Sequence, residues 1–144
     1  MRILVSACLM GLCTRYDGGH NENKAVLALM DRHVLIPACP EQLGGLPTPR
    51  VPCEQVGRQV LSKEGRDCTG AFVLGAELAL QTFDLCGCEA AILKARSPSC
   101  GKGPTYDGSF TRALADRPGV FAGMLLKRGV PVYSEEDTEA LAAL

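Results

Sequence analysis

Three short hydrophobic runs, each followed by a cysteine, constrain the fold of this chain more than any other feature of the sequence. Short apolar runs bounded by glycine and proline predict buried β-strands. If the three strands run parallel in one sheet, their cysteines gather at its carboxyl edge, where open α/β sheets bind ligands. The runs are Ile3–Ala7 before Cys8, Val34–Ala38 before Cys39, and Ala91–Lys94 upstream of Cys100.

The segments between these strands predict helices. Apolar residues recur at helical spacing over 69–86, which predicts a long central helix, and shorter helices are expected over 21–32 and 120–128. A fourth strand is expected over Val130–Tyr133, followed by a last helix capped by residues 134–137. Alternating strands and helices predict an α/β fold, a three-layer α/β/α sandwich with a Rossmann-like, mostly parallel sheet, in one domain over residues 1–144.

Three local features complete the expected fold. Segment 39–52 holds four prolines and two glycines, so we expect a rigid loop without helix. Residues 55–68 predict a hairpin or edge strand, with a turn at 63–65. Either Asn21 or Asn23 is expected to cap the helix that follows it.

The composition favours a small-molecule partner. The 47% hydrophobic and 22% charged residues are typical of a globular protein, and no apolar stretch reaches the roughly 20 residues that span a membrane. A net charge of −1 and an aromatic content of 5% disfavour binding to bulk nucleic acid. The oligomeric state stays open.

The eight cysteines indicate metal or thiol chemistry. Met1 and Arg2 lead directly into an apolar strand without a signal-peptide pattern, so we expect a cytoplasmic protein. In a reducing compartment, cysteines more often bind a metal or cluster, or react as thiols, than form disulfides.

Cys8, Cys39 and Cys100 are the candidate metal ligands. Their thiols suit a soft centre such as an iron–sulfur cluster or zinc, and three ligands would leave one position open. Each could instead be a small buried hydrophobe. Cys13 is the alternative fourth ligand, which would close the site. No role is assigned to the remaining cysteines, Cys53, Cys68, Cys86 and Cys88.

Polar residues beside these cysteines are candidates for chemistry. Glu41 follows Cys39 by two residues, and in an apolar pocket it would have a raised pKa and act as general acid or base. It could also be a solvated loop residue. Ser97 and Ser99 precede Cys100, and one hydroxyl could donate to a substrate or act as nucleophile, although Ser-Pro is also an ordinary turn.

Several charged residues in the same loops could bind an anion. Asp17 and Asp107 lie in two similar Tyr-Asp-Gly turns and could orient the arginines, or serve the turns alone. The candidates for substrate or anion binding are Arg15, Asp17, Arg50, Ser99 and Asp107, and the other cations in these loops are Lys94, Arg96 and Lys102.

A series of motifs extends along nearly the whole chain: Val5–Leu9, Arg15–Gly18, Cys39–Glu41, Gly44–Arg50, Leu93–Lys94, Ser97–Gly101 and Tyr106–Phe110. In this order they resemble a bacterial family, long grouped as a domain of unknown function, that includes thiouracil desulfidases.

The resemblance implies a [4Fe-4S] cluster held by Cys8, Cys39 and Cys100. It implies a non-redox reaction in which the unligated iron acts as a Lewis acid on the thiocarbonyl of a thionated base. Water or a hydroxyl would replace the sulfur, and hydrosulfide would leave. Glu41 would be the acid–base residue and Ser97 the nucleophile or a positioning residue. Many relatives lack a cysteine at the position of Cys13, which favours the three-ligand site.

The sequence therefore supports two hypotheses for the function. The first is an iron–sulfur-dependent desulfidase that acts on thiouracil or a related thionated heterocycle. The second is a cluster- or zinc-binding sensor or sulfur carrier without turnover, in which Cys13 completes a set of four cysteine ligands or one cysteine carries a persulfide.

Overall fold

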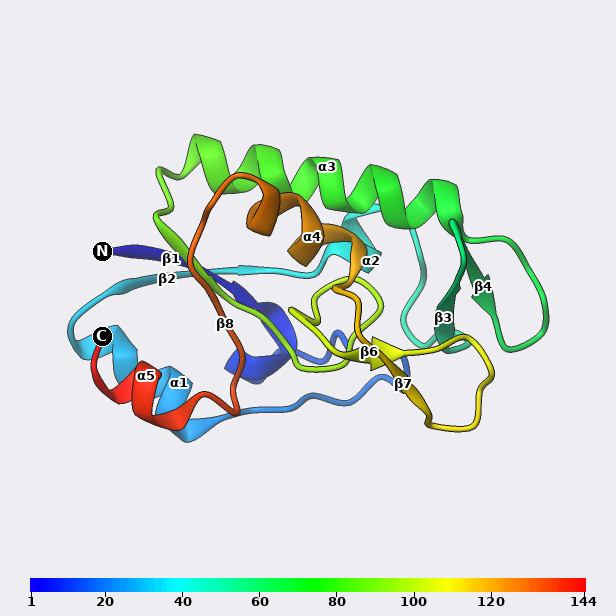
Figure 1. Ribbon diagram of the computed structural model, residues 1–144. Coiled ribbons are helices and arrows are strands. Elements are labelled where there is room, and N and C mark those ends of the chain that lie inside the picture. The colour runs from blue at the N-terminus through cyan, green and yellow to red at the C-terminus, as the bar shows by residue number, and fades with distance from the viewer.

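Four short parallel strands form the central sheet of the protein (Figure 1), whose structure, a computed structural model, describes residues 1–144. The strands are β1 (Arg2–Ser6), β2 (Val34–Ala38), β5 (Ala90–Ile92) and β8 (Val132–Tyr133). Their order is β2-β1-β5-β8, so the three strands expected to precede cysteines are neighbours. In the register, Val5 lies between Pro37 and Ile92. Proline is tolerated there because β2 is an edge strand. The predicted parallel sheet is confirmed.

Helices cover both faces of the sheet, which confirms the predicted three-layer sandwich (Figure 1). The face that carries Leu4 packs against helices α3 and α4, and the face that carries Ile3 and Val5 packs against α1 and α5. No helix is both long enough and apolar enough to cross a lipid bilayer. The bounds are α1 (Lys24–Ala28), α3 (Thr69–Leu85), α4 (Val120–Lys127) and α5 (Thr138–Ala142).

Two small antiparallel hairpins lie beyond the carboxyl end of the sheet (Figure 1). They are β3 (Cys53–Val56) with β4 (Gln59–Ser62), and β6 (Thr105–Tyr106) with β7 (Leu114–Ala115). The first was predicted, and so was the turn at 63–65, where the Gly65 N–H donates to the Ser62 carbonyl at 2.8 Å. The turn that joins β3 to β4 lies at Gly57 and Arg58 and was not predicted. Gly57 has a φ of +59°, which glycine adopts without strain. The second hairpin was not predicted, because two-residue strands leave no periodic pattern.

Two short helical turns occupy segments that were predicted to be loops. Helix α2 (Pro40–Leu43) lies within the proline-rich segment, where no helix was expected. That expectation was wrong because Pro40 stands at the first helical position, where a missing N–H costs nothing. The 3₁₀ turn η1 (Ala7–Met10) follows β1 directly, and it contains Cys8.

The first predicted helix is shorter than expected. It covers only α1 and a 3₁₀ turn η2 (Leu29–Asp31), and Asn23 is its cap, since its side chain accepts the Val26 N–H at 3.1 Å. The last helix begins at Thr138, and its N-cap residue is Asp137, within the predicted capping segment 134–137. Residues 134–137 form a turn closed by the Ser134 N–H, which donates to Asp137 Oδ2 at 2.8 Å. The fourth strand likewise begins at Val132 rather than at Val130.

Helix α2 crosses helix α3 at a contact between two glycines. A Cβ atom on Gly75 would lie 1.8 Å from the Pro40 carbonyl oxygen, and one on Gly44 would lie 1.9 Å from the Ala71 carbonyl oxygen. Distances this short are impossible for real atoms, so neither glycine tolerates a side chain. Because α2 directly follows Cys39, this crossing fixes where Cys39 lies.

The loop that carries Cys100 is held by the start of α4. The N–H groups of Gly119, Val120 and Phe121 donate to the carbonyls of Gly101 (2.7 Å), Pro98 (2.9 Å) and Ser99 (2.9 Å). The loop therefore satisfies donors that the first turn of a helix otherwise leaves unpaired.

Replacement of Gly75 by alanine should destabilise the protein by about 1–3 kcal/mol, because the added Cβ forces α2 away from α3. Gly70 is the matched control, since it lies in the same helix with open space around its Cβ position. Gly70→Ala should leave the free energy of unfolding unchanged or raise it by up to about 1 kcal/mol. Urea denaturation of both variants measures this, and equal stabilities would contradict the crossing.

Candidate functional site

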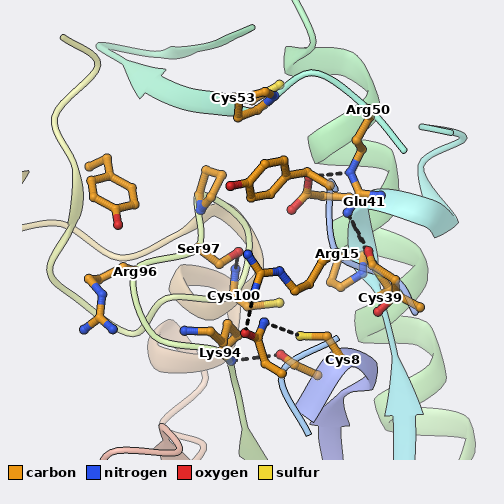
Figure 2. A pocket seen from close by; sticks show the side chains of 18 of the residues that line it. Cys8, Arg15, Cys39, Glu41, Arg50, Cys53, Lys94, Arg96, Ser97 and Cys100 are labelled. Carbon is orange, nitrogen blue, oxygen red and sulfur yellow. Dashed lines mark hydrogen bonds and ion pairs between the residues drawn. The ribbon is translucent and has the colours of Figure 1, made fainter. Parts of the chain in front are cut away.

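A cavity of about 550 Å³ opens beyond the carboxyl ends of the strands, where the parallel sheet predicts a ligand site. The loops after β1, β2 and β5 form much of its wall, and the two hairpins contribute the rest. Figure 2 shows side chains from these segments facing the same space.

The three cysteines singled out in the sequence all line this cavity. Cys8 lies in η1, Cys39 directly after β2, and Cys100 in the loop after β5 (Figure 2). Cys8 and Cys100 are buried and Cys39 is partly buried, and all three are free thiols. Cys13, the alternative fourth ligand, is exposed and is not part of the cavity wall.

The candidate ligands could bind a single metal ion or a metal–sulfide cluster, and these two groups place different demands on their donors. No three His, Cys, Asp or Glu side chains lie close enough together to hold a single metal ion. Zinc gathers its sulfurs at about 2.3 Å from one centre. A metal–sulfide cluster spreads its cysteine ligands over several metal atoms, and thiolates are the soft donors that it takes. The donor set therefore fits a soft cluster.

Burial affects the protonation of these thiols. It raises the pKa of Cys8, and the Asn21 amide opposes that shift. It also raises the pKa of Cys100, which the Ser6 hydroxyl opposes. Metal ligands bind as thiolates, so a metal group that binds here releases protons from these thiols.

Glu41 and Arg50 form a largely buried ion pair in the cavity wall. Arg50 Nε lies 3.1 Å from Glu41 Oε1, and the two side chains are only 6% and 16% exposed. The same guanidinium donates to the Thr14 carbonyl at 2.8 Å, so it connects the first loop with the second. Burial raises the pKa of Glu41, and the Arg50 charge opposes the shift. The carboxyl group is partly closed off, as the sequence suggested.

Ser97 lines the cavity and also shapes the Cys100 loop. Its Oγ accepts the N–H groups of Ser99 at 3.2 Å and Cys100 at 3.0 Å. Ser99, by contrast, is fully buried outside the cavity wall, and its Oγ has no hydrogen-bond partner. Of the two serines, only Ser97 can reach a ligand in the cavity.

Cations outnumber carboxylates in the cavity wall. The carboxylates are Glu41 and Glu54, and Glu54 accepts the backbone N–H groups of Gly108 and Phe110 at 3.0 and 3.1 Å. An excess of positive charge favours a ligand with net negative charge. The lining cations are Arg15, Arg50, Lys63, Lys94, Arg96 and Arg112.

The two Tyr-Asp-Gly aspartates lie outside the cavity wall. Asp17 contacts Arg15, with 3.2 Å between Oδ2 and Nη2, so it orients a lining cation. Asp107 accepts the Ser109 N–H at 2.9 Å and serves its own turn. Lys102, the other loop cation named from the sequence, pairs with Asp137 instead of facing the cavity.

Several lining residues were not identified from the sequence. Cys53 and Glu54 lie in β3, Lys63 directly follows β4, and Arg112 lies in the loop between β6 and β7. Only the tertiary fold brings them to the cavity. Asn21 was considered only as a helix cap, but its side chain contacts Cys8. The sequence offered one signal for this contact. Asn23 caps the helix, so Asn21, two residues earlier, is left without a capping role.

Comparison with known proteins identifies the family. Residues 3–137 match the family model described as 2-thiouracil desulfurase. The chain belongs to the 2-thiouracil desulfurase family. This confirms the resemblance seen in the sequence motifs.

Two relatives of this 2-thiouracil desulfurase family member are similar over almost their whole length. A Bacillus subtilis (strain 168) protein, named "Uncharacterized protein YbbK", is 37% identical over an alignment of 145 residues that covers 94% of this chain and 96% of the relative. A solved structure described as the [4Fe-4S]-dependent thiouracil desulfidase TudS is 40% identical, with a TM-score of 0.89. The match covers 99% of this chain and 95% of that one.

Removal of the Arg50 side chain should destabilise the protein by about 3 kcal/mol, because Arg50→Met leaves the Glu41 carboxylate buried without a partner. Adding Glu41→Gln should restore part of the loss. Arg128→Met breaks an exposed ion pair with Asp84 and should have little effect. Urea denaturation of the metal-free proteins measures each change, and equal losses from both arginines would contradict the prediction.

Proposed function

We propose that this chain is a [4Fe-4S]-dependent, non-redox desulfidase that removes sulfur from thiouracil or a related thionated nucleobase. The net reaction exchanges the thiocarbonyl sulfur for the oxygen of water and yields the oxo base and hydrosulfide. The observation that carries the proposal is the convergence of Cys8, Cys39 and Cys100, the free thiols of the three strand-end loops, on one cavity, which Cys53 of β3 also lines. The likeness to TudS, at 40% identity, supports the choice of cofactor and reaction.

Cys8, Cys39 and Cys100 would hold the cluster, one from each of the three strand-end loops. When bound, a [4Fe-4S] cluster with three protein ligands supplies a Lewis-acidic iron with an open coordination position for sulfur. Cations such as Arg15, Arg50 and Lys94 offset negative charge in the cavity. Residues 1–144 would then form one cluster-binding domain.

Glu41 is the residue we assign to proton transfer. Its side chain lines the cavity next to the Cys39 loop, and burial raises its pKa toward the range in which a carboxyl group both gives and takes protons. Arg50 Nε contacts Oε1 alone, so Oε2 is the atom left to exchange a proton with water or with the base.

Ser97 suits hydrogen-bond donation better than nucleophilic attack. Two backbone N–H groups already occupy the lone pairs of its oxygen. The hydroxyl hydrogen stays free to donate toward the cavity that Ser97 lines. We therefore assign Ser97 to positioning of the substrate, with water as the source of oxygen.

The alternative is a non-catalytic cluster or zinc module with four cysteine ligands. It requires Cys13, which is exposed and lies outside the cavity wall. A cluster with three cysteine ligands and one open iron position therefore agrees better with the position of Cys13, and such a cluster can take part in catalysis.

Cysteine substitutions distinguish the two functions. Protein isolated without oxygen should contain about four irons per chain. Cys100→Ala should lose the iron and the release of hydrosulfide from thiouracil, while Cys13→Ala should keep both. Iron and sulfide analysis, together with a hydrosulfide assay, measures this. Loss of iron from Cys13→Ala would instead support the four-cysteine module.

Glu41→Gln should lower kcat by about 10²–10⁴-fold while the protein keeps its iron, since the amide cannot transfer a proton. Glu77→Gln, on the exposed side of α3, removes the same charge far from this chemistry and should leave kcat unchanged. Steady-state kinetics on iron-loaded proteins compares them. Full activity in Glu41→Gln would exclude the assigned role.

A further inference from the structure

Asn21 connects a cavity arginine to a cysteine sulfur. Its Nδ2 lies 3.6 Å from Cys8 Sγ, and its Oδ1 accepts a hydrogen bond from Arg15 Nη1 at 2.8 Å. The dashed lines at Arg15 and Cys8 in Figure 2 mark these two contacts. The Asn21 backbone N–H also donates to the Cys8 carbonyl at 2.9 Å, so both ends of this contact are fixed.

The orientation of the Asn21 amide follows from the chemistry of its neighbours. A guanidinium group has donors only, so Arg15 must face the amide oxygen. The NH₂ group is then directed at Cys8 Sγ. A thiolate sulfur carries no proton, so in that state Cys8 Sγ is an acceptor only. Asp17 holds Arg15 from the other side at 3.2 Å. Asn21 is not needed as a helix cap, because Asn23 fills that role.

We propose that Asn21 is a positioning residue for the sulfur of Cys8, and that Arg15 acts through it by fixing the amide orientation. This inference rests on the proposed [4Fe-4S] site. A hydrogen bond to a thiolate stabilises its negative charge and weakens its donation of electrons to a bound iron. Loss of this donor makes the reduced, more negative state of the bound group less favourable.

The test is the midpoint potential of the cluster, measured by a redox titration monitored with electron paramagnetic resonance. Asn21→Leu removes the donor and should lower the equilibrium constant for reduction about tenfold, which is about 59 mV for one electron. Asn21→Ala removes the same donor without added bulk and should lower the potential likewise. An unchanged potential in either variant would overturn the inference.

Asn23→Ala is the matched control. It removes a helix cap two residues away, which costs stability but touches no cysteine. Its potential should equal that of the wild type, and a shift as large as that of Asn21→Leu would overturn the inference. Wild-type protein without iron would overturn the proposed function itself, whereas iron-loaded variants with equal potentials overturn only the role of Asn21.

The part played by Arg15 is tested by a double-mutant cycle. Arg15→Gln should lower the potential more in the wild type than in the Asn21→Leu background, because part of its effect passes through the amide. Arg112→Gln removes a charge from the same cavity without a sulfur contact, so its effect should be equal in both backgrounds. Equal shifts for Arg15→Gln in both backgrounds would overturn the coupling.

Discussion

Strand β1 is the element on which the rest of the structure depends. Ile3, Leu4 and Val5 are fully buried, and the strand pairs with neighbours on both sides. A shift by one residue would turn these side chains to the wrong faces, and each contributes about 1.5–3 kcal/mol by burial. The strand ends are therefore locked in register. At that edge the Ser6 hydroxyl accepts the Lys94 N–H at 2.9 Å, which ties the first loop to the third.

Close backbone contacts fix the positions of the cysteine loops relative to the sheet. The glycine crossing of α2 with α3 places the Cys39 loop, and a Cβ on Gly119 would lie 2.6 Å from the Ser99 carbonyl oxygen, which leaves the Cys100 loop no room to move toward α4. Arg50 bridges the Cys39 loop to the Thr14 carbonyl. Three loops that are distant in sequence are thus held by contacts with little freedom. A site that must bind one rigid group with three ligands needs this preorganisation.

The cavity cysteines could be predicted from the sequence because a strand pattern is local and parallel strands end at one edge. The register of β1 with β2 and β5 confirms that part of the reasoning. The hairpin residues Lys63 and Glu54 could not be found this way, since their place depends on where a short turn closes. Helix α2 was missed because the proline that argues against a helix interior is compatible with its first position. The role of Asn21 was hidden because asparagine is equally suited to a cap.

Electrostatics relates the thiols to Glu41. A thiolate at Cys100 and a carboxylate at Glu41 disfavour each other, as the Glu41 charge adds to burial in raising the pKa of Cys100. Burial also raises the pKa of Glu41. The positive charge of Arg50 opposes this shift. The ion pair with Arg50 sets this balance, because it stabilises the carboxylate without removing it from the cavity wall. A carboxyl group held between these two influences is suited to carrying a proton in one step and giving it up in the next.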